Sequence, residues 1–223
     1  QVLGGLGGVI MGTVVNRILA ADSHWGFPEN YALIFGLASL AFIIAGIALT
    51  FVQEPEGCYP KANTPSILET FRSIPKILKQ DHAFLRLILI KIIAGFVSMA
   101  SSFYVLYAVR LGGLDVASSG LLMSAQVAGT IAAGLLISVV QDARGPLYHI
   151  RLVCILATVP PAAALILSAT SGQFQAPLVV YMALFFVLGL ALSSFGWPFY
   201  NWIIERASAE NRPLYIGSIN TLS

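Results

Sequence analysis

The sequence predicts an all-α fold, a polytopic membrane helical bundle, and three observations support this prediction. Of the 223 residues, 57% are hydrophobic and only 10% are charged. In a water-soluble domain roughly a quarter of the residues are charged, so lipid must solvate much of the surface of this chain. The apolar residues also form runs of helical length, and most charges lie in the connections between these runs. The net charge of +2 gives no indication of nucleic-acid binding.

Six apolar segments are long enough to cross the hydrocarbon core, which takes about 20 residues of helix. Their length and near lack of charge argue against buried helices of a soluble protein, and the short alternation of a membrane barrel is absent. A seventh segment begins near Leu214. The six predicted spans are residues 2–19, 31–52, 84–109, 119–140, 152–169 and 178–204.

The first span contains the stretch GGLGGVIMG, with Gly4, Gly8 and Gly12 at every fourth position. Small residues at such a spacing let two membrane helices approach closely. We therefore expect these three glycines to form a helix-packing face.

The long connection between the second and third spans predicts an amphipathic helix. Thr64 is a possible N-cap followed by Pro65, and Ser66 with Glu69 has the spacing of a capping box. Pro75 is expected to kink or split the helix. Two placements stay open: on the membrane surface, or against the protein's own helix ends. Apolar Ile67, Leu68, Phe71, Ile74 and Leu78 recur at helical spacing, and Arg72, Lys76 and Lys79 take the other side.

Lys and Arg alternate between rich and poor connections along the chain. The connections 53–83, 141–151 and 205–213 contain several of these cations, whereas 21–30, 110–117 and 168–177 contain one or none. Loops rich in Lys and Arg stay in the cytoplasm. We therefore predict that residues 53–83, 141–151 and 205–213 are cytoplasmic.

Polar side chains inside the spans are costly in lipid, so each of them requires a reason. In the third span Lys91, Gly95, Ser98 and Ser102 form one stripe on a helix. Such residues either face a solute cavity or have a structural role: a lysine reaches the headgroups, and hydroxyls hold helices together. The prolines at 160, 161 and 198 are expected to interrupt their helices. The fourth span adds Gln126 and Thr130, and the sixth adds Asn201.

No catalytic or metal-binding pattern is present in the sequence. It contains no HExxH, no Gly-rich phosphate loop and no Cys/His pair, and no Asp or Glu falls in the middle of a complete span. Cys58 and Cys154 predict neither a disulfide framework nor a metal site. We therefore expect no enzyme activity, no metal and no cofactor.

Two stretches, SVVQDARGPL at 138–147 and ENRPLYIGSINTL at 210–222, together with the order of spans and loops, resemble the major facilitator superfamily. The first is similar to that family's G-x-x-x-D-R-x-G-R-R motif: Asp142 and Gly145 match, and Arg144 stands one place late. Ser138 and Ala143 replace the first Gly and the Arg, and Pro146 and Leu147 replace the basic pair. The first span lacks the Gly-Pro pair of the family's proton-driven drug antiporters.

The resemblance implies part of a twelve-helix transporter with two halves. Residues 1–52 would be the last two helices of the N-terminal bundle, 53–83 the cytoplasmic linker, and 84–223 the first four helices of the C-terminal bundle and the start of a fifth. The chain begins without Met and ends inside an apolar element, so we expect an internal piece of a longer protein.

The implied function is secondary active transport of a small solute across the cell membrane by alternating access, with membrane lipid and a coupling ion as further partners. Asp142, Arg144 and Gly145 would brace the cytoplasmic helix ends. The cavity candidates are Lys91, Ser98, Ser102, Gln126, Thr130 and Asn201. The contrasting hypothesis is a polytopic scaffold or sensor that transports nothing, and a membrane enzyme comes third.

Overall fold

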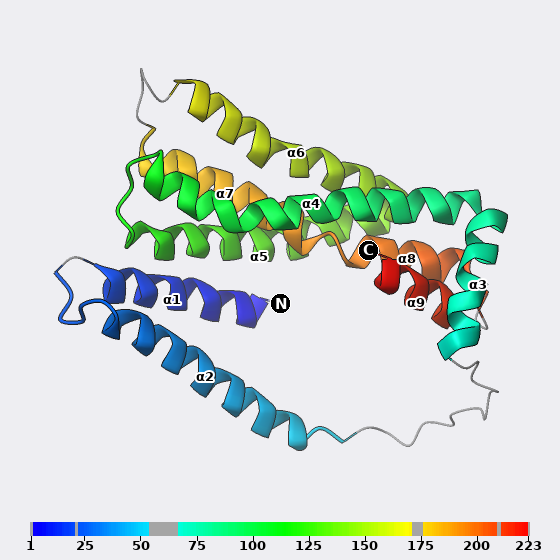
Figure 1. The fold of residues 1–223 in the computed structure, drawn as a ribbon, viewed down its shortest axis with the longest axis horizontal. Helices are drawn as coiled ribbons and strands as arrows, with labels where there is room; N and C mark the ends of the chain where they lie inside the picture. The colour runs from blue at the N-terminus through cyan, green and yellow to red at the C-terminus, as the bar shows by residue number, and fades with distance from the viewer. Residues whose placement is uncertain (1, 21, 54–66, 171–175, 209–210, 223) are drawn as a thin grey trace.

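The computed structural model describes residues 2–20, 22–53, 67–170, 176–208 and 211–222. In these ranges the chain is built from helices and no strand is present, so the all-α prediction is confirmed (Figure 1). The helices are α1 (Val2–Leu19), α2 (Glu29–Thr50), α3 (Ile67–Gln80), α4 (His82–Arg110), α5 (Ser118–Arg144), α6 (Pro146–Thr170), α7 (Leu178–Ser193), α8 (Trp197–Arg206) and α9 (Arg212–Leu222).

Within the described residues, five helical segments are long and apolar enough to cross a membrane. They are α2, α4, α5, α6 and the segment Leu178–Arg206, which takes in both α7 and α8. The shorter α1 is also apolar. These segments coincide with the six predicted spans, because a run of about 20 apolar residues is the length that the hydrocarbon core requires.

The predicted connection at residues 141–151 is wrong in its extent. Helix α5 runs to Arg144 and α6 begins at Pro146, so that Gly145 alone separates them. Hydropathy marks the part of a helix that lies in hydrocarbon, whereas polar side chains are tolerated where a helix extends beyond it. Proline suits the first position of a helix, because a backbone N–H at that position would have no partner within the helix.

Proline breaks only one of the three helices in which we expected an interruption. Helix α3 continues through Pro75, and α6 continues through Pro160 and Pro161. In membrane bundles, packing and neighbouring groups offset the lost backbone hydrogen bond, and Pro160 is indeed fully buried. At Pro198 the break is present, because α7 ends at Ser193 and α8 begins at Trp197. The predicted cap residues 64–66 lie outside the described residues.

Helix α3 packs its apolar side against the protein's own helices rather than leaving it free. Ile74 is buried, and Ile77 and Leu78 pack against a core cluster at the start of α4, while Arg72 and Lys76 are exposed. Of the two placements considered from the sequence, the structure therefore has the one against the helix ends.

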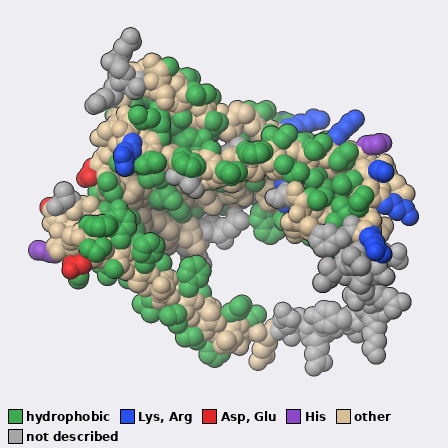
Figure 2. All heavy atoms as spheres, viewed as in Figure 1, with side chains coloured by type: hydrophobic (Ala, Val, Ile, Leu, Met, Phe, Trp, Pro, Cys, Tyr) green, Lys and Arg blue, Asp and Glu red, His purple; other side chains and the backbone are tan. Residues whose placement is uncertain are grey.

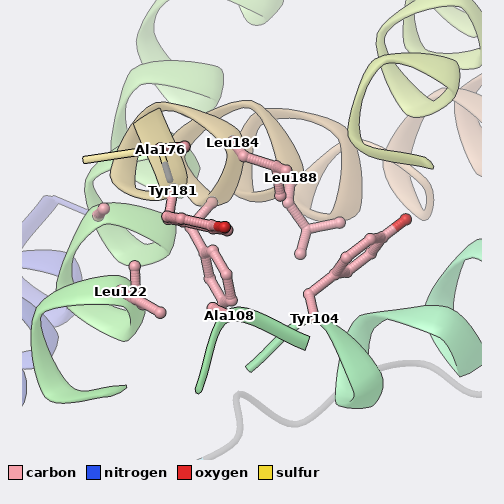
Figure 3. Close-up of a cluster of buried hydrophobic side chains, with 9 residues drawn as sticks. Tyr104, Ala108, Leu122, Ala176, Tyr181, Leu184 and Leu188 are labelled. Carbon is pink, nitrogen blue, oxygen red and sulfur yellow. The ribbon is translucent and has the colours of Figure 1, made fainter. Parts of the chain in front are cut away.

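Two clusters of buried side chains form the core. The first joins α4, α5 and α7 and includes Tyr104, Ala108, Leu122, Tyr181 and Leu188 (Figure 3). The second joins the start of α4 to α6, α8 and α9 and contains Phe84, Leu87, Ile88, Ile150, Phe199, Ile203 and Ile219. The two clusters lie towards opposite ends of the bundle.

Glycines bring α5 close to two other helices. On the α7 side, a Cβ added to Gly129 would clash with the backbone of Phe186, and one added to Gly189 would clash with the backbone of Gln126. On the α1 side, a Cβ at Gly12 would meet Ser124 and one at Gly8 would meet Val127.

Of the three glycines predicted for packing, Gly8 and Gly12 lie against α5, whereas Gly4 has no described atom within 4 Å. Gly5 takes its place, facing Ile131 of α5. Residues spaced by four drift around an α-helix by roughly 40° at each step, because a turn takes 3.6 residues. The stripe Gly5, Gly8 and Gly12, spaced by three and four, stays on one face.

Charge is unevenly distributed over the molecule. Lys and Arg side chains gather at the end where α3 lies, which we call the basic end, while the rest of the visible surface is largely hydrophobic (Figure 2). Helix α2 has no buried residue, and Phe42, Ile43 and Leu49 are among its exposed side chains. Such a surface is stable in lipid rather than in water.

Candidate functional site

A pocket of about 320 Å³ lies towards the basic end, where the end of α5, the start of α6 and the break between α7 and α8 meet. Its volume is within the roughly 300–1,000 Å³ of pockets that hold small molecules. The bundle around it is apolar, but six of its nine lining residues have polar side chains. The lining residues are Ala133, Gly134, Gln141, Asp142, His149, Ser193, Ser194, Trp197 and Asn201.

The break between α7 and α8 provides one wall of the pocket. Pro198 lies in the first turn of α8, where it cannot continue the hydrogen bonds of α7. At the end of α7, the Ser193 and Ser194 hydroxyls both donate to the carbonyl of Leu190, at 3.5 and 3.2 Å. Both distances are longer than the roughly 2.5–3.0 Å of an ordinary O–H···O hydrogen bond, so each hydroxyl can also serve the pocket as a donor or an acceptor.

The turn between α5 and α6 provides the opposite wall. Gly145 has φ = 81° and ψ = 168°, a conformation essentially restricted to glycine. Its N–H donates to the carbonyl of Gln141 at 2.7 Å, and its own carbonyl accepts from the N–H of His149 at 3.3 Å. This single-residue turn brings the side chains of Gln141 and Asp142 next to the first turn of α6.

His149 is almost fully enclosed, with 4% of its surface exposed, as is Ser194. Its Nδ1 lies 2.8 Å from Oε1 of Gln141. Since an amide oxygen only accepts, Nδ1 carries the proton and donates, which leaves a lone pair on Nε2 of the neutral ring. This Nε2 is buried and has no hydrogen-bond partner among the residues that the structure describes. A buried polar atom without a partner is costly and is uncommon in folded proteins.

Asp142 gives the pocket its only formal charge among the lining residues. No Lys or Arg belongs to this lining. Arg144, two residues after Asp142, is directed elsewhere: its Nη1 donates to the Tyr148 hydroxyl at 2.8 Å, and its guanidinium carbon lies 4.8 Å from the centre of that ring. The lining therefore carries one negative charge, and no Lys or Arg in it balances that charge.

Few of the residues predicted for a cavity lie in this pocket. Asn201 lines it, and so does Asp142 of the motif. Thr130 lies at the contact of α5 with α7, where its hydroxyl is 3.2 Å from the carbonyl of Gln126 and 3.5 Å from that of Gly189. Gln126 is half-buried on the same helix and is not among the lining residues.

The predicted stripe on α4 also lies outside the pocket. The Lys91 ammonium is half-buried and lies 5.2 Å from the centre of the Tyr200 ring, one residue before Asn201. Ser98 is exposed, and Gly95 has nothing within 4 Å among the described residues. The side chain of Ser102 lies outside the described residues.

Sequence reasoning missed Gln141, His149 and Ser193 as pocket residues. Gln141 and His149 fall in the stretch expected to be a connection, and polar residues in a connection are usually explained by solvent. The signal that was available is the dipeptide Gly145-Pro146, which fits a helix end followed by a helix start. If one helix ends and the next begins at this dipeptide, residues 141 and 149 lie on either side of a single tight turn and are close in space.

A second polar cluster ties three helices at the basic end. Oδ1 of Asp81 accepts from the N–H groups of Ala83 and Phe84, each at 3.0 Å, and so caps α4. Its Oδ2 accepts from the Tyr215 hydroxyl of α9 at 3.4 Å and lies 3.7 Å from Nε of Arg206 in α8. One carboxylate thus links the starts of α4 and α9 to the end of α8.

The described residues contain no group of three or more His, Cys, Asp or Glu side chains that could hold a metal ion. Comparison with protein families finds one whose description is Major Facilitator Superfamily, and its model matches residues 1–223. Neither the curated proteins nor the solved structures contain a match to the chain. The family match and the five apolar helices identify a multi-pass membrane protein.

Proposed function

This chain belongs to the major facilitator superfamily of membrane transporters, and we propose that it moves a small solute by secondary active transport with alternating access. The observation that carries the proposal is the pocket at the break between α7 and α8. There, polar side chains from three membrane-spanning segments converge inside an otherwise apolar bundle. In transporters, solute sites are typically built at discontinuous helices.

The break also supports a conformational step. Helix α7 is held against α5 by Gly129 and Gly189, each of which faces the backbone of the other helix. No such glycine contact joins α8 to α5 among the described residues. The three residues between α7 and α8 are therefore the point at which α8 could change its angle while α7 stays fixed. In alternating access, segments of this kind open and close the path to a site.

The gathering of Lys and Arg at the basic end supports an orientation in which this end faces the cytoplasm (Figure 2). On this proposal the chain lies in the cell membrane, and residues 53–83, 141–151 and 205–213 are cytoplasmic. Asp142, Arg144 and Gly145 then form a cytoplasmic turn, and the pocket is the part of the solute path nearest to the cytoplasm.

The polar face of α4 continues the proposed path. Ser98 is exposed, and Lys91 lies over the ring of Tyr200, next to the pocket residue Asn201. We include Lys91, Ser98 and Ser102 in the path on this basis. The Thr130 hydroxyl and the backbone of Gln126 lie at the contact of α5 with α7, and we assign to these two residues the positioning of the helices.

The direct test is transport by the purified protein in proteoliposomes, measured over a panel of small cationic, anionic and neutral solutes with and without a proton gradient. We expect saturable, gradient-dependent uptake of at least one solute, and Asn201→Ala should reduce it at least severalfold. Asn220→Ala is the matched control, because this asparagine accepts from Tyr200 on α8 outside the pocket. If no member of the panel is transported above empty liposomes, the proposal of a transporter for small solutes fails.

A further inference from the structure

The turn between α1 and α2 contains a pocket of about 300 Å³, separate from the solute pocket. We propose that this pocket binds the phosphate group of a membrane lipid. The proposal goes beyond the transport function and does not depend on it. It is carried by a cation and two further side chains with N–H groups, which line one pocket at the boundary of the bilayer. The lining residues are Val14, Arg17, Ile18, Ser23, His24 and Trp25.

The side chain of Ser23 holds the turn that forms this pocket. Its hydroxyl donates to the carbonyl of Ile18 at 2.9 Å and accepts from the N–H of Trp25 at 3.0 Å. A serine that bonds to backbone groups on both sides of itself stabilises one conformation of a turn. The last turn of α1, which contains Arg17, is thereby joined to the backbone that follows His24. This explains how side chains from the helix and from the turn line one pocket.

The pocket lies at the level of the lipid headgroups. Helix α2 is long and apolar enough to cross a membrane, and α1 is also apolar, so the turn between them lies at a membrane boundary. Figure 1 shows this turn at the opposite end of the molecule from α3. Trp25 and Tyr31, on either side of the start of α2, are exposed, and Trp and Tyr are enriched where hydrocarbon meets headgroups. Arg17 in the last turn of α1 therefore reaches the layer of lipid phosphates.

The polar side chains of the lining match an anion with several acceptors. The guanidinium of Arg17 has five N–H donors and no acceptor, the indole of Trp25 has one donor and no acceptor, and His24 adds a ring N–H. Arg17 is exposed and forms no ion pair with an acidic side chain in the described part of the chain. Asp22 and Glu29 are exposed and do not belong to the lining. The free oxygens of a phosphodiester only accept, and a guanidinium binds two of them at once.

The apolar part of the lining favours a lipid over a soluble anion. Val14 and Ile18 stand four residues apart, on one face of α1. At 1.5 Å per residue, Val14 lies about 5 Å deeper in the membrane than Arg17. The phosphate of a lipid continues into acyl chains, which contact such a wall on its hydrocarbon side. A free phosphate ion gains nothing from these side chains and loses part of its hydration.

The experiment measures which lipids surround Trp25. Trp197→Phe and Trp202→Phe leave Trp25 as the only tryptophan. The purified protein is reconstituted in bilayers of digalactosyldiacylglycerol, whose headgroup is uncharged and contains no phosphate. Dibrominated phosphatidylglycerol, whose bromine atoms quench tryptophan on contact, is titrated in, and dibrominated digalactosyldiacylglycerol with the same acyl chains is the reference. We expect phosphatidylglycerol to be enriched about tenfold next to Trp25, since a hydrogen bond to a charged group is worth this factor. Equal quenching by the two lipids would overturn the proposal.

Variants of the arginine separate a built site from a charge that only reaches the headgroups. Arg17→Gln should abolish the enrichment. Arg17→Lys keeps the charge but lacks the planar fork that binds two phosphate oxygens, so most of the enrichment should be lost as well. The matched control is Arg110→Gln, because Arg110 is exposed in the last turn of α4 and lies outside the lining. Full enrichment in Arg17→Lys, or an equal loss in Arg110→Gln, would contradict the site, because attraction by charge alone would then suffice.

Two further arms test the turn and the source of the phosphate. Ser23→Ala removes no group that we assign to the phosphate, but it releases the turn, so the enrichment should fall severalfold; full enrichment would contradict the pocket. Inorganic phosphate in large excess should leave the enrichment unchanged, with chloride at the same ionic strength as the control. Loss of the enrichment with phosphate and not with chloride would overturn the lipid in favour of a soluble anion. Variants are compared only where gel filtration gives a monodisperse peak, so that unfolding is not counted as lost binding.

Discussion

The close approach of α5 and α7 predicts that alanine is not tolerated at Gly129 or Gly189. A methyl group on Gly129 would overlap the carbonyl of Phe186, and one on Gly189 would overlap the carbonyl of Gln126. Both obstacles are backbone atoms of a helix, and a carbonyl in a helix cannot rotate away as the end of a side chain can. Relief therefore requires the two helices to move apart.

The expected magnitude is the balance of two effects. Alanine in place of glycine stabilises a helix by roughly 0.8–1.0 kcal/mol. An extra methyl in a packed interface costs about 1–3 kcal/mol, occasionally more, and a backbone obstacle favours the upper end. Each substitution should thus lower the free energy of unfolding by about 2 kcal/mol. For a chain of this length, 1 kcal/mol corresponds to roughly 2–4 °C in Tm, so Tm should fall by about 4–8 °C.

The assay is thermal unfolding of the purified protein in detergent, followed by tryptophan fluorescence and by the loss of the monodisperse peak in gel filtration. Gly95→Ala is the matched control, because Gly95 lies mid-helix in α4 and no atom of the described residues lies within 4 Å of an added Cβ. It should leave Tm unchanged or raise it slightly.

The double variant tests the reasoning itself. Once α5 and α7 have separated to admit one methyl group, the second should fit at little extra cost. The loss of stability should therefore be clearly smaller than the sum of the two single losses. A Gly129→Ala variant as stable as Gly95→Ala, or a double variant whose loss equals the sum, would refute a backbone-to-backbone contact at this point.

Four further predictions follow from other parts of the fold. Asp81→Ala should lower the free energy of unfolding by about 1–2 kcal/mol, because it removes the cap of α4. The ion pair with Arg206 adds little to this value, since Arg206 is largely exposed. Asp81→Asn keeps an acceptor and should recover most of the loss in the same thermal assay. Gly145→Ala should cost about 1–3 kcal/mol, since φ = 81° with ψ = 168° is a conformation for glycine; a loss no greater than that of Gly217→Ala, which has open space around it, would contradict the turn. In a cysteine-free background, Cys at Lys91 or Ser98 should react with a small hydrophilic thiol reagent, and failure of both positions to label would exclude the α4 face from the solute path. A reporter fused after Gln173 should read out as external, and a cytoplasmic signal would reverse the proposed orientation.

The sequence predicted the membrane-spanning segments well because their physical cause is local. A run such as residues 31–52 is apolar over the length that lipid requires, and α2 occupies nearly the same range, Glu29–Thr50. The helix ends near charged residues were predicted less well. At 141–151 the apolar pattern stops before the backbone hydrogen bonds do, and only the conformation of Gly145 defines where α5 ends.

The pocket depends on which helices lie side by side, and no local pattern contains that information. Asn201 and Asp142 were both singled out from the sequence, but for separate roles on separate segments. The structure brings them to one lining through the Gly145 turn on one side and the break before Pro198 on the other. Thr130 illustrates the converse case, because a polar residue inside a span proved to hydrogen-bond to carbonyls at a helix contact.

The position of the pocket relative to the glycine contact connects ligand binding with movement. Ser193 and Ser194 belong to the end of α7, the helix that Gly129 and Gly189 hold against α5, whereas Trp197 and Asn201 belong to α8 beyond the break. A ligand in this pocket touches both sides of the break at once. A ligand shifts a conformational equilibrium only by the difference between its affinities for the two states. Any change in the angle of α8 alters the distance of Trp197 from His149 and Asp142, and this changes the affinity of the pocket for its ligand. A ligand that contacted only α5 and α6 would not affect the angle of α8.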